Sequence, residues 1–187
     1  LWRFTVISAS FLTAVVLFHI LVPILPIPAE KDRTLYEIRG WDDLGLQVLE
    51  VQQSMPDPSN TFLFGVRYQI ASELAFYVPG QPYTVSINRW NRPNVYDYWW
   101  RDEDLTGKDA VGVLRDGDSH ERFQEVFARV DLPKPFYLYP RKYNKRTDGA
   151  SEPVKVLYIY RCYGFKGGLR WIPPRPDDIR AVASFRP

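Results

Sequence analysis

The apolar segment Phe4–Ala29 constrains the fold most, because it contains no Asp, Glu, Lys or Arg. It exceeds the roughly 20 residues that an α-helix needs to cross a bilayer. A cleaved signal peptide is one alternative, but its apolar core has only about 7–15 residues and ends at a small-residue cleavage site. A buried helix is the other alternative, yet so small a domain has little surface to cover every apolar face. The segment therefore predicts a transmembrane helix within residues 1–29.

Residues 61–87 carry the pattern of a strand, a helix and a second strand. The apolar run Phe62–Phe64 ends at Gly65, and a second run, Tyr83–Ile87, comes after the helix stops. Between them, apolar residues recur at helical spacing: Ile70, Leu74, Tyr77 and Val78. This order predicts a βαβ unit with two parallel strands. Its first turn, Gly65–Arg67, then lies where α/β sheets bind ligands and where free N–H groups favour anions.

The remaining elements predict a second α/β unit and one further strand. Trp41–Gln53 has the apolar stripe of a helix, and Asp109–Leu114 has the character of a strand. A helix with one apolar face follows, and then a strand at Pro135–Tyr139; the helix face consists of Phe123, Val126, Phe127 and Val130. The strand Val154–Phe165 follows a loop rather than a helix, so we expect it to be antiparallel at an edge of the sheet.

The predicted organisation has four parts. They are a transmembrane helix at 1–29, a juxtamembrane helix and linker at 30–60, an α/β domain at 61–170 and an irregular tail at 171–187. The fold class is α/β, with the N-terminal transmembrane helix followed by a small mixed-sheet domain built from two strand-helix-strand units.

Between the two units lies segment 88–104, which is rich in Trp, Tyr, Asn and Arg and has no clean period. Exposed aromatic rings beside Asn and Arg suit sugar stacking or the headgroup level of a membrane. The alternative is that these rings fill a small core, since large aromatic side chains are mostly buried. The sequence leaves both open for its four central rings: Tyr96, Tyr98, Trp99 and Trp100.

Composition argues against a metal centre and against a cofactor. One cysteine, Cys162, and two histidines, His19 and His120, give no internal disulfide and few ligands for zinc. Two D-x-D patterns, at 102–104 and 116–118, match carboxylate pairs that hold divalent cations, but a solvated loop and a helix cap explain them better. No nucleophile motif, P-loop or dinucleotide fingerprint is present.

Charge gives little indication of a partner, since the net charge is only +2. A basic loop at Arg141–Arg146 is the one local concentration, and a solvated loop without a partner explains it best. If it binds a partner, the membrane helix on the same chain favours anionic lipid headgroups over nucleic acid. We therefore expect no nucleic-acid partner. The first residue is Leu1 rather than Met, so we expect the chain to be a piece of a longer protein.

Arg67–Tyr77 resembles a segment of the bacterial glycosyltransferases of family 39, in which it also stands between an apolar strand and a Pro-Gly turn. These are polytopic GT-C enzymes, related to the aminoarabinose transferases of lipid A and to protein O-mannosyltransferases. The proline-rich helix exit His19–Pro28, the pair Gly40-Trp41 and the segment Tyr163–Gly167 agree with the resemblance. It spans most of the chain.

The resemblance implies the last membrane helix and the C-terminal extracytoplasmic domain of a plasma-membrane glycosyltransferase. Such enzymes transfer a sugar from a polyprenyl-phosphate donor to a lipid or protein acceptor, and their catalytic acids lie in an early loop outside this chain. No catalytic residue is expected here, and the domain would cap the active site or help to recognise the acceptor beside the upstream transmembrane part. The residues expected to make such contacts are Arg67, Tyr68, Tyr96, Trp99 and Lys166.

Two other functions remain open at this point. One is a single-pass membrane-anchored binding or sensor domain that recognises a sugar or an anionic ligand at the strand ends. The other is a structural partner subunit without a ligand.

Overall fold

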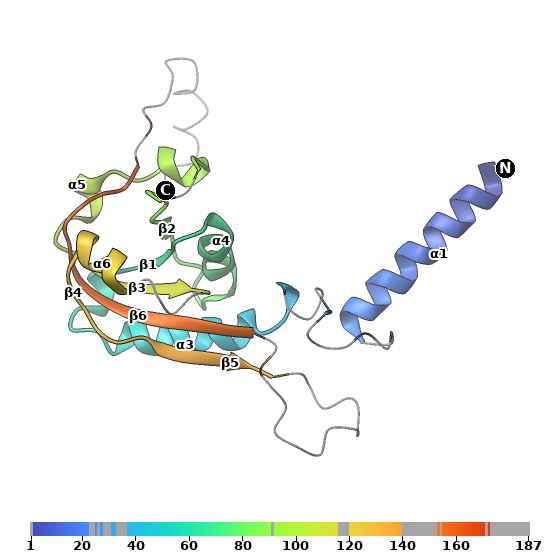
Figure 1. Cartoon of the computed structure of the whole chain (residues 1–187), viewed down its shortest axis with the longest axis horizontal. Coiled ribbons are helices and arrows are strands. Elements are labelled where there is room, and N and C mark those ends of the chain that lie inside the picture. The colour runs from blue at the N-terminus through green and yellow to red at the C-terminus, as the bar shows by residue number, and fades with distance from the viewer. Residues whose placement is uncertain are drawn as a thin grey trace. The chain divides into compact units, whose positions relative to one another are not determined.

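The computed structural model describes residues 2–22, 25, 27, 31–32, 37–90, 92–115, 120–139, 153, 155–170 and 172, and the structural statements below refer to these. The chain divides into two compact units (Figure 1). The first contains Leu1–Gly40 and Tyr137–Val156, and the second contains Trp41–Phe136 and Leu157–Pro187. The helix cap predicted at Asp118, the basic loop 141–149 and all of the predicted tail except Ile172 lie outside the described residues.

The first unit begins with helix α1, Trp2–Leu21, which is 20 residues long. It is long and apolar enough to cross a membrane, which confirms that part of the prediction. Most of its apolar side chains are exposed, with Trp2 at 79% and Phe11 at 66%. The helix ends before the prolines that follow it, because proline lacks the N–H group that would continue the hydrogen-bond ladder.

The second unit is built on a mixed sheet in the order β2-β1-β3-β6-β4, with β5 also paired to β6. The strands are β1 (Thr61–Gly65), β2 (Thr84–Ser86), β3 (Asp109–Leu114), β4 (Phe127–Val130), β5 (Lys134–Leu138) and β6 (Lys155–Phe165). Strand β1 is parallel to β2 and β3, whereas β6 is antiparallel to β3 and β4. The predicted mixed α/β fold is confirmed, and so is the first βαβ unit.

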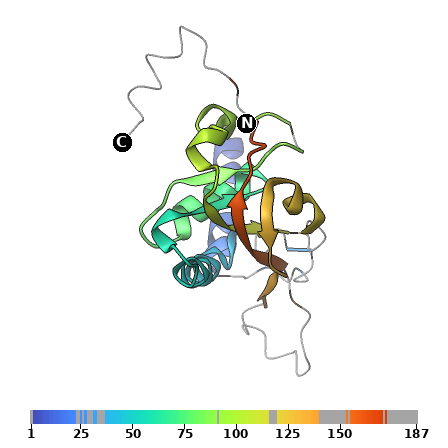
Figure 2. The same ribbon diagram turned by 90° about the vertical axis from the view of Figure 1, so that its left-hand side faces the viewer.

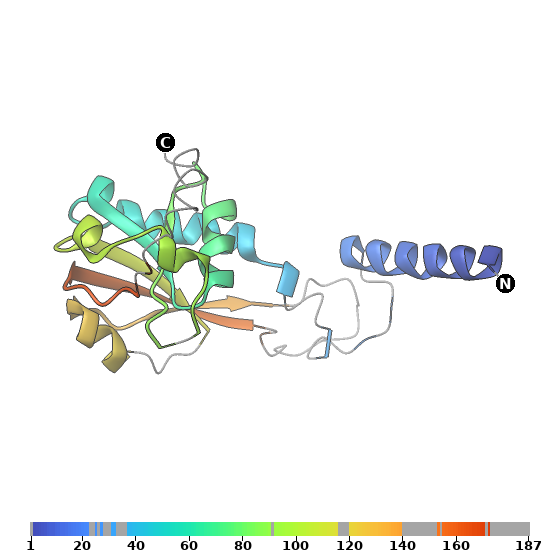
Figure 3. The ribbon, with the colours of Figure 1, turned by 90° about the horizontal axis from the view of Figure 1, so that it is seen from above.

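Helices cover both faces of this sheet. Helices α3 (Trp41–Gln53) and α4 (Tyr68–Tyr77) lie on one face and α6 (His120–Val126) lies on the other, as Figures 2 and 3 show from two directions. Three shorter helices complete the unit: η1 (Pro58–Asn60), η2 (Val95–Tyr98) and α5 (Asp102–Leu105).

An aromatic core lies on the α6 face of the sheet. The ring of Phe64, from β1, is 5.3 Å from that of Phe123 in α6 and 5.5 Å from that of Phe127 in β4. Phe123 also packs edge-on against Tyr160 of β6, at 5.1 Å. All four rings are buried. Aromatic residues make up 16% of the chain, and this core accounts for part of them.

The position of β6 corrects one prediction. The strand is antiparallel as expected, but it lies between β3 and β4 and not at an edge. Its position follows from its length and burial: it spans 11 residues, and Leu157, Ile159 and Cys162 along it are buried. A strand that is buried along its length can pair with neighbours on both sides. The loop that precedes β6 in the sequence gives no indication of this.

The end of the predicted second helix is also corrected. Helix α6 stops at Val126, and Phe127–Val130 forms strand β4, paired with β6 from Phe127↔Phe165 to Val130↔Cys162. Apolar residues three apart fit a helix, but the pairing with a distant strand decides otherwise. Because β6 is antiparallel to both β3 and β4, these two strands point the same way, and β3-α6-β4 is the second strand-helix-strand unit.

Candidate functional site

The first feature of the site is the tight turn between β1 and α4. A Cβ atom at Gly65 would lie 2.6 Å from the backbone nitrogen of Ala71 and 2.9 Å from the Cβ of Ile70. Only glycine allows the end of β1 to approach the first turn of α4 this closely. The helix therefore begins directly over the carboxyl end of the strand, as the sequence predicts for Gly65–Arg67.

The N-terminus of α4 has no side-chain cap. Its N-cap residue, Arg67, is extended and makes no side-chain capping bond, and the first turn has no acidic residue. The carbonyl of Arg67 accepts from the N–H groups of Ile70 and Ala71, at 3.0 and 3.2 Å. No described residue accepts a hydrogen bond from the N–H groups of Tyr68 and Gln69. These two donors and the positive end of the helix dipole favour an anion.

Ser86, at the carboxyl end of β2, faces the same place. Its Cα pairs with Gly65 in the parallel register, and its side chain lies on the same face as that of Thr84, two residues earlier. The Thr84 hydroxyl donates to the carbonyl of Ala71 at 2.8 Å, which identifies that face as the α4 side. Ser86 is 4% exposed, and its hydroxyl has no hydrogen-bond partner among the described residues.

The aromatic segment after β2 packs against α4. Some of its rings are buried and others are exposed, so each of the two alternatives left open by the sequence holds for part of the segment. The Tyr96 hydroxyl is 3.1 Å from Oγ of Ser72 in α4, and the Trp100 indole N–H donates to the Thr84 carbonyl at 3.1 Å. Tyr96 is buried, whereas Tyr98 and Trp99 are 42% and 51% exposed. The Trp99 ring packs at a tilt of 56° against Tyr96, with 4.8 Å between the centroids, so a buried ring positions an exposed one.

A buried polar group holds this segment in place. One oxygen of Asp97 accepts from the backbone N–H of Asn94 at 2.9 Å and from the Asn88 amide at 3.4 Å. The same Asn88 amide donates to the carbonyl of Arg92 at 2.6 Å. Asp97 and Asn88 are each 2% exposed. Sequence reasoning missed these residues; the Asn94–Asp97 spacing of a capping box was the available signal.

The structure separates Lys166 from the other four predicted contact residues. Lys166 follows β6, whose last residue, Phe165, donates its N–H to Lys108 just before the start of β3. Arg67 follows the opposite end of the parallel strands, two residues beyond β1. The Lys166 ammonium instead donates to the carbonyl of Gln124 at 2.6 Å. Arg67, Tyr68, Tyr96 and Trp99 gather around α4, and Lys166 does not join them.

The D-x-D pattern at 102–104 has a structural role. The carboxylate of Asp102 accepts from the N–H groups of Gly168 and Leu169, at 2.9 Å each. The carboxylate of Asp104 accepts from the N–H of Arg101 at 3.0 Å. Among the described residues, no group of three His, Cys, Asp or Glu side chains is placed to hold a metal ion. The other pattern, at 116–118, lies outside those residues.

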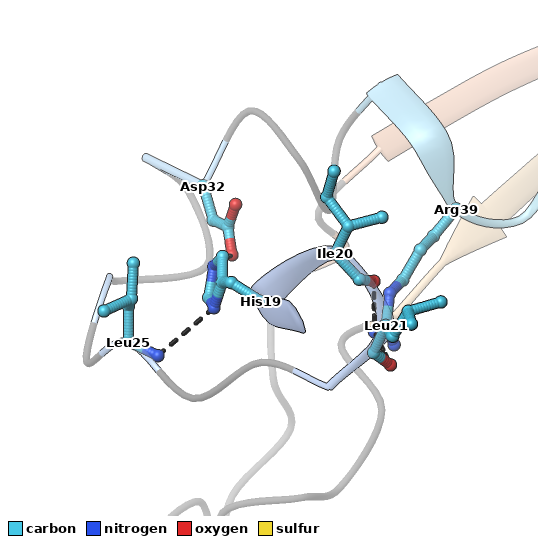
Figure 4. Close-up of polar contacts among 6 residues, drawn as sticks. All are labelled: His19, Ile20, Leu21, Leu25, Asp32 and Arg39. Carbon is cyan, nitrogen blue, oxygen red and sulfur yellow. Dashed lines mark hydrogen bonds and ion pairs between the residues drawn. The ribbon is translucent and has the colours of Figure 1, made fainter. Parts of the chain in front are cut away.

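The first unit contains a separate polar cluster at the end of α1, drawn in Figure 4. The Leu25 N–H donates to Nδ1 of His19 at 3.1 Å, and Nε2 of His19 lies 3.2 Å from a carboxylate oxygen of Asp32. Because Nδ1 accepts, the arrangement fits the neutral ring with its proton on Nε2. Arg39 donates to the last carbonyls of α1, at Ile20 and Leu21, where a cation stabilises the helix dipole.

Comparisons of the chain with known protein families, with characterised proteins and with solved structures found no match.

Proposed function

We propose that this chain is the last membrane helix and the C-terminal extracytoplasmic domain of a polytopic GT-C glycosyltransferase of family 39. One observation carries the proposal. A membrane-length helix and a βαβ domain stand in one short chain, and the segment Arg67–Tyr77, which resembles those enzymes, is the helix of that βαβ unit. The enzyme would transfer a sugar from a polyprenyl-phosphate donor to a lipid or protein acceptor at the outer face of the plasma membrane.

The role of this part of the enzyme is to bind and position the substrate, and the chemistry takes place elsewhere. Trp99 offers a half-exposed ring that packs at a tilt against the buried ring of Tyr96, and exposed aromatic rings suit stacking on a sugar. Arg67 and Tyr68 are exposed at the start of the neighbouring helix. The catalytic acids belong to the upstream transmembrane part of the same protein, which is the main partner of this domain.

The test is a transfer assay on the complete polypeptide in membranes. Sugar transfer from a labelled polyprenyl-phosphate donor is measured for the wild type, Trp99→Ala and the control Tyr137→Ala, which removes a ring of similar exposure from β5. We expect Trp99→Ala to raise the KM for the acceptor by about tenfold, one stacking contact of about 1–1.5 kcal/mol, with kcat retained. Absence of transfer by the wild type, or equal KM values for both variants, contradicts the proposal.

The second candidate function is a membrane-anchored binding domain without a transferase. The uncapped start of α4 and the unpaired Ser86 hydroxyl favour this function. Both can bind a ligand, and neither requires a transfer reaction. This function predicts ligand binding by the full chain and no sugar transfer by the complete polypeptide.

A further inference from the structure

We propose that the carboxyl ends of β1 and β2 form a binding site for a phosphate group, either free or in a phosphate ester. Its donors are the backbone N–H groups of Tyr68 and Gln69, the Ser86 hydroxyl and the Arg67 guanidinium. The site is defined by these contacts alone and does not depend on the proposed transferase function.

The helix supplies the first part of the argument. Helix α4 has 10 residues, and a helix of this length carries a partial positive charge at its N-terminus. Most helices neutralise that end with Ser, Thr, Asp or Asn at the N-cap, but α4 has Arg67 there and no acidic residue in its first turn. The arrangement adds a cation to an end that is already positive, which costs free energy unless an anion binds.

The unpaired hydroxyl of Ser86 supplies the second, independent part. A buried hydroxyl without a partner costs about 1–3 kcal/mol, so few persist without a role. The parallel register sets Ser86 beside Gly65, on the face that packs against α4. Ser86 lies two residues beyond Thr84, which bonds to Ala71, and α4 runs back along the strands. The Ser86 hydroxyl therefore points at the first turn of α4.

Gly65 and Arg67 explain why the anion would be a phosphate. With no Cβ at Gly65, the strand end and the helix start lie close enough for donors from both to reach one ligand. The side chain of Arg67 is exposed and free to fold over the ligand, and its planar fork matches two phosphate oxygens. A tetrahedral anion with several oxygens can accept from all of these groups at once and offers two oxygens to the guanidinium fork.

The test uses the full chain in nanodiscs of zwitterionic lipid, with backbone amide chemical shifts followed by NMR as inorganic phosphate is added. We expect the Tyr68 and Gln69 signals to shift and saturate. Ser86→Ala and Arg67→Gln should each weaken binding by about tenfold or more, as expected for a hydrogen bond to a charged group. The control Arg122→Gln removes the same charge from an exposed position on α6, on the opposite face of the sheet, and should leave binding unchanged.

A second arm identifies the source of the phosphate. The same signals are compared in nanodiscs that contain phosphatidic acid and in nanodiscs of zwitterionic lipid alone. Shifts with inorganic phosphate support a free phosphate or a soluble ester, and shifts only with phosphatidic acid support a lipid headgroup. If neither probe moves the Tyr68 and Gln69 signals, or if Ser86→Ala binds as tightly as the wild type, the site does not exist.

Thermal melting of Ser86→Ala distinguishes loss of phosphate binding from loss of the fold. Without phosphate, the variant should melt at the same or a higher temperature than the wild type, because an unpaired buried hydroxyl has been removed. Phosphate should raise the melting temperature of the wild type, and of Ser86→Ala much less. A variant that melts much lower without phosphate would show that the hydroxyl serves the fold, which overturns the inference. Loss of transferase activity in the complete polypeptide would leave all of these outcomes unaffected.

Discussion

The hydroxyl of Tyr96 lies 3.1 Å from Oγ of Ser72, and this bond joins the aromatic segment to α4. Trp99 packs at a tilt against the Tyr96 ring, which the bond fixes, and is itself half exposed. The two neighbouring rings therefore have different roles: Tyr96 holds the aromatic segment against α4, and Trp99 exposes its ring to solvent.

This division predicts different effects for substitutions at the two rings. Tyr96→Phe should lower the free energy of unfolding by about 1 kcal/mol, because it leaves the Ser72 hydroxyl without this partner. Trp99→Ala should change it by less than about 0.5 kcal/mol, since the indole is exposed. Urea denaturation of the full chain in detergent micelles, followed by far-UV circular dichroism, measures both. A larger loss for Trp99→Ala than for Tyr96→Phe would show that the roles are reversed.

Gly65→Ala should be strongly destabilising, by about 2–4 kcal/mol. The added methyl group meets the backbone nitrogen of Ala71 at 2.6 Å, and backbone cannot move aside as a flexible side chain does. The control is Gly107→Ala, where a Cβ meets nothing within 4 Å but φ is +83°, so that only about 1 kcal/mol of backbone strain is expected. Thermal melting of the two variants in parallel measures the difference, and equal losses would contradict the close approach of β1 and α4.

Asp102 should matter for stability and not for metal binding. Asp102→Ala leaves the N–H groups of Gly168 and Leu169 without their carboxylate, so we expect a loss of about 1–3 kcal/mol. The control Glu103→Gln, at an exposed neighbouring position, should change stability little. Addition of Mn²⁺ should not raise the melting temperature of the wild type. A rise that Asp102→Ala abolishes would instead restore the metal function of the D-x-D pattern.

Cys162 gives a prediction about pH. Burial, and then the nearby Asp131 carboxylate, raise the pKa of the Cys162 thiol well above its ordinary value of 9.0. In the unfolded chain the thiol ionises above about pH 8.5, while in the folded chain it stays protonated. The contribution of the protonated Cys162 thiol to the free energy of unfolding is therefore fully present below that pH. It is lost above it, by up to about 1.4 kcal/mol per pH unit.

Urea denaturation at a series of pH values from about 7 to 10 measures this loss, with Cys162→Ala as the comparison. The variant should be less stable at neutral pH, because a buried side chain has been truncated, but its stability should fall less steeply with pH. Other groups that lose protons near the top of this range are common to both proteins and cancel in the difference. Parallel pH profiles would contradict a buried, protonated thiol.

The local elements were accessible from the sequence because each has a strong pattern of its own. Trp41–Gln53 and Asp109–Leu114 have the predicted bounds, and the Gly65 turn lies where a strand meets a helix. The errors arose where distant pairing decides the structure. Phe127–Val130 has helical spacing but is held as a strand by β6, and β6 itself is placed inside the sheet by a partner that follows α6.

The candidate site was predictable only in part, for the same reason. Arg67 and Tyr68 follow from the helix start, and the exposure of Trp99 fits one of the two functions considered for its segment. Ser86 carries no signal in sequence, since its importance comes from the register that sets it beside Gly65. The sequence around Lys166 does not show that β6 is antiparallel to β3, and this direction is what carries Lys166 to the far end of the sheet.

The reading frame upstream of Leu1 tests the central claim most directly. A membrane glycosyltransferase predicts several further apolar segments of membrane length before Leu1, with paired acidic residues in an early loop between them. A start codon immediately before Leu1 would contradict that account, because the chain would then lack any place for the catalytic acids. The protein would in that case be a single-pass anchored domain, and its function would be ligand binding alone.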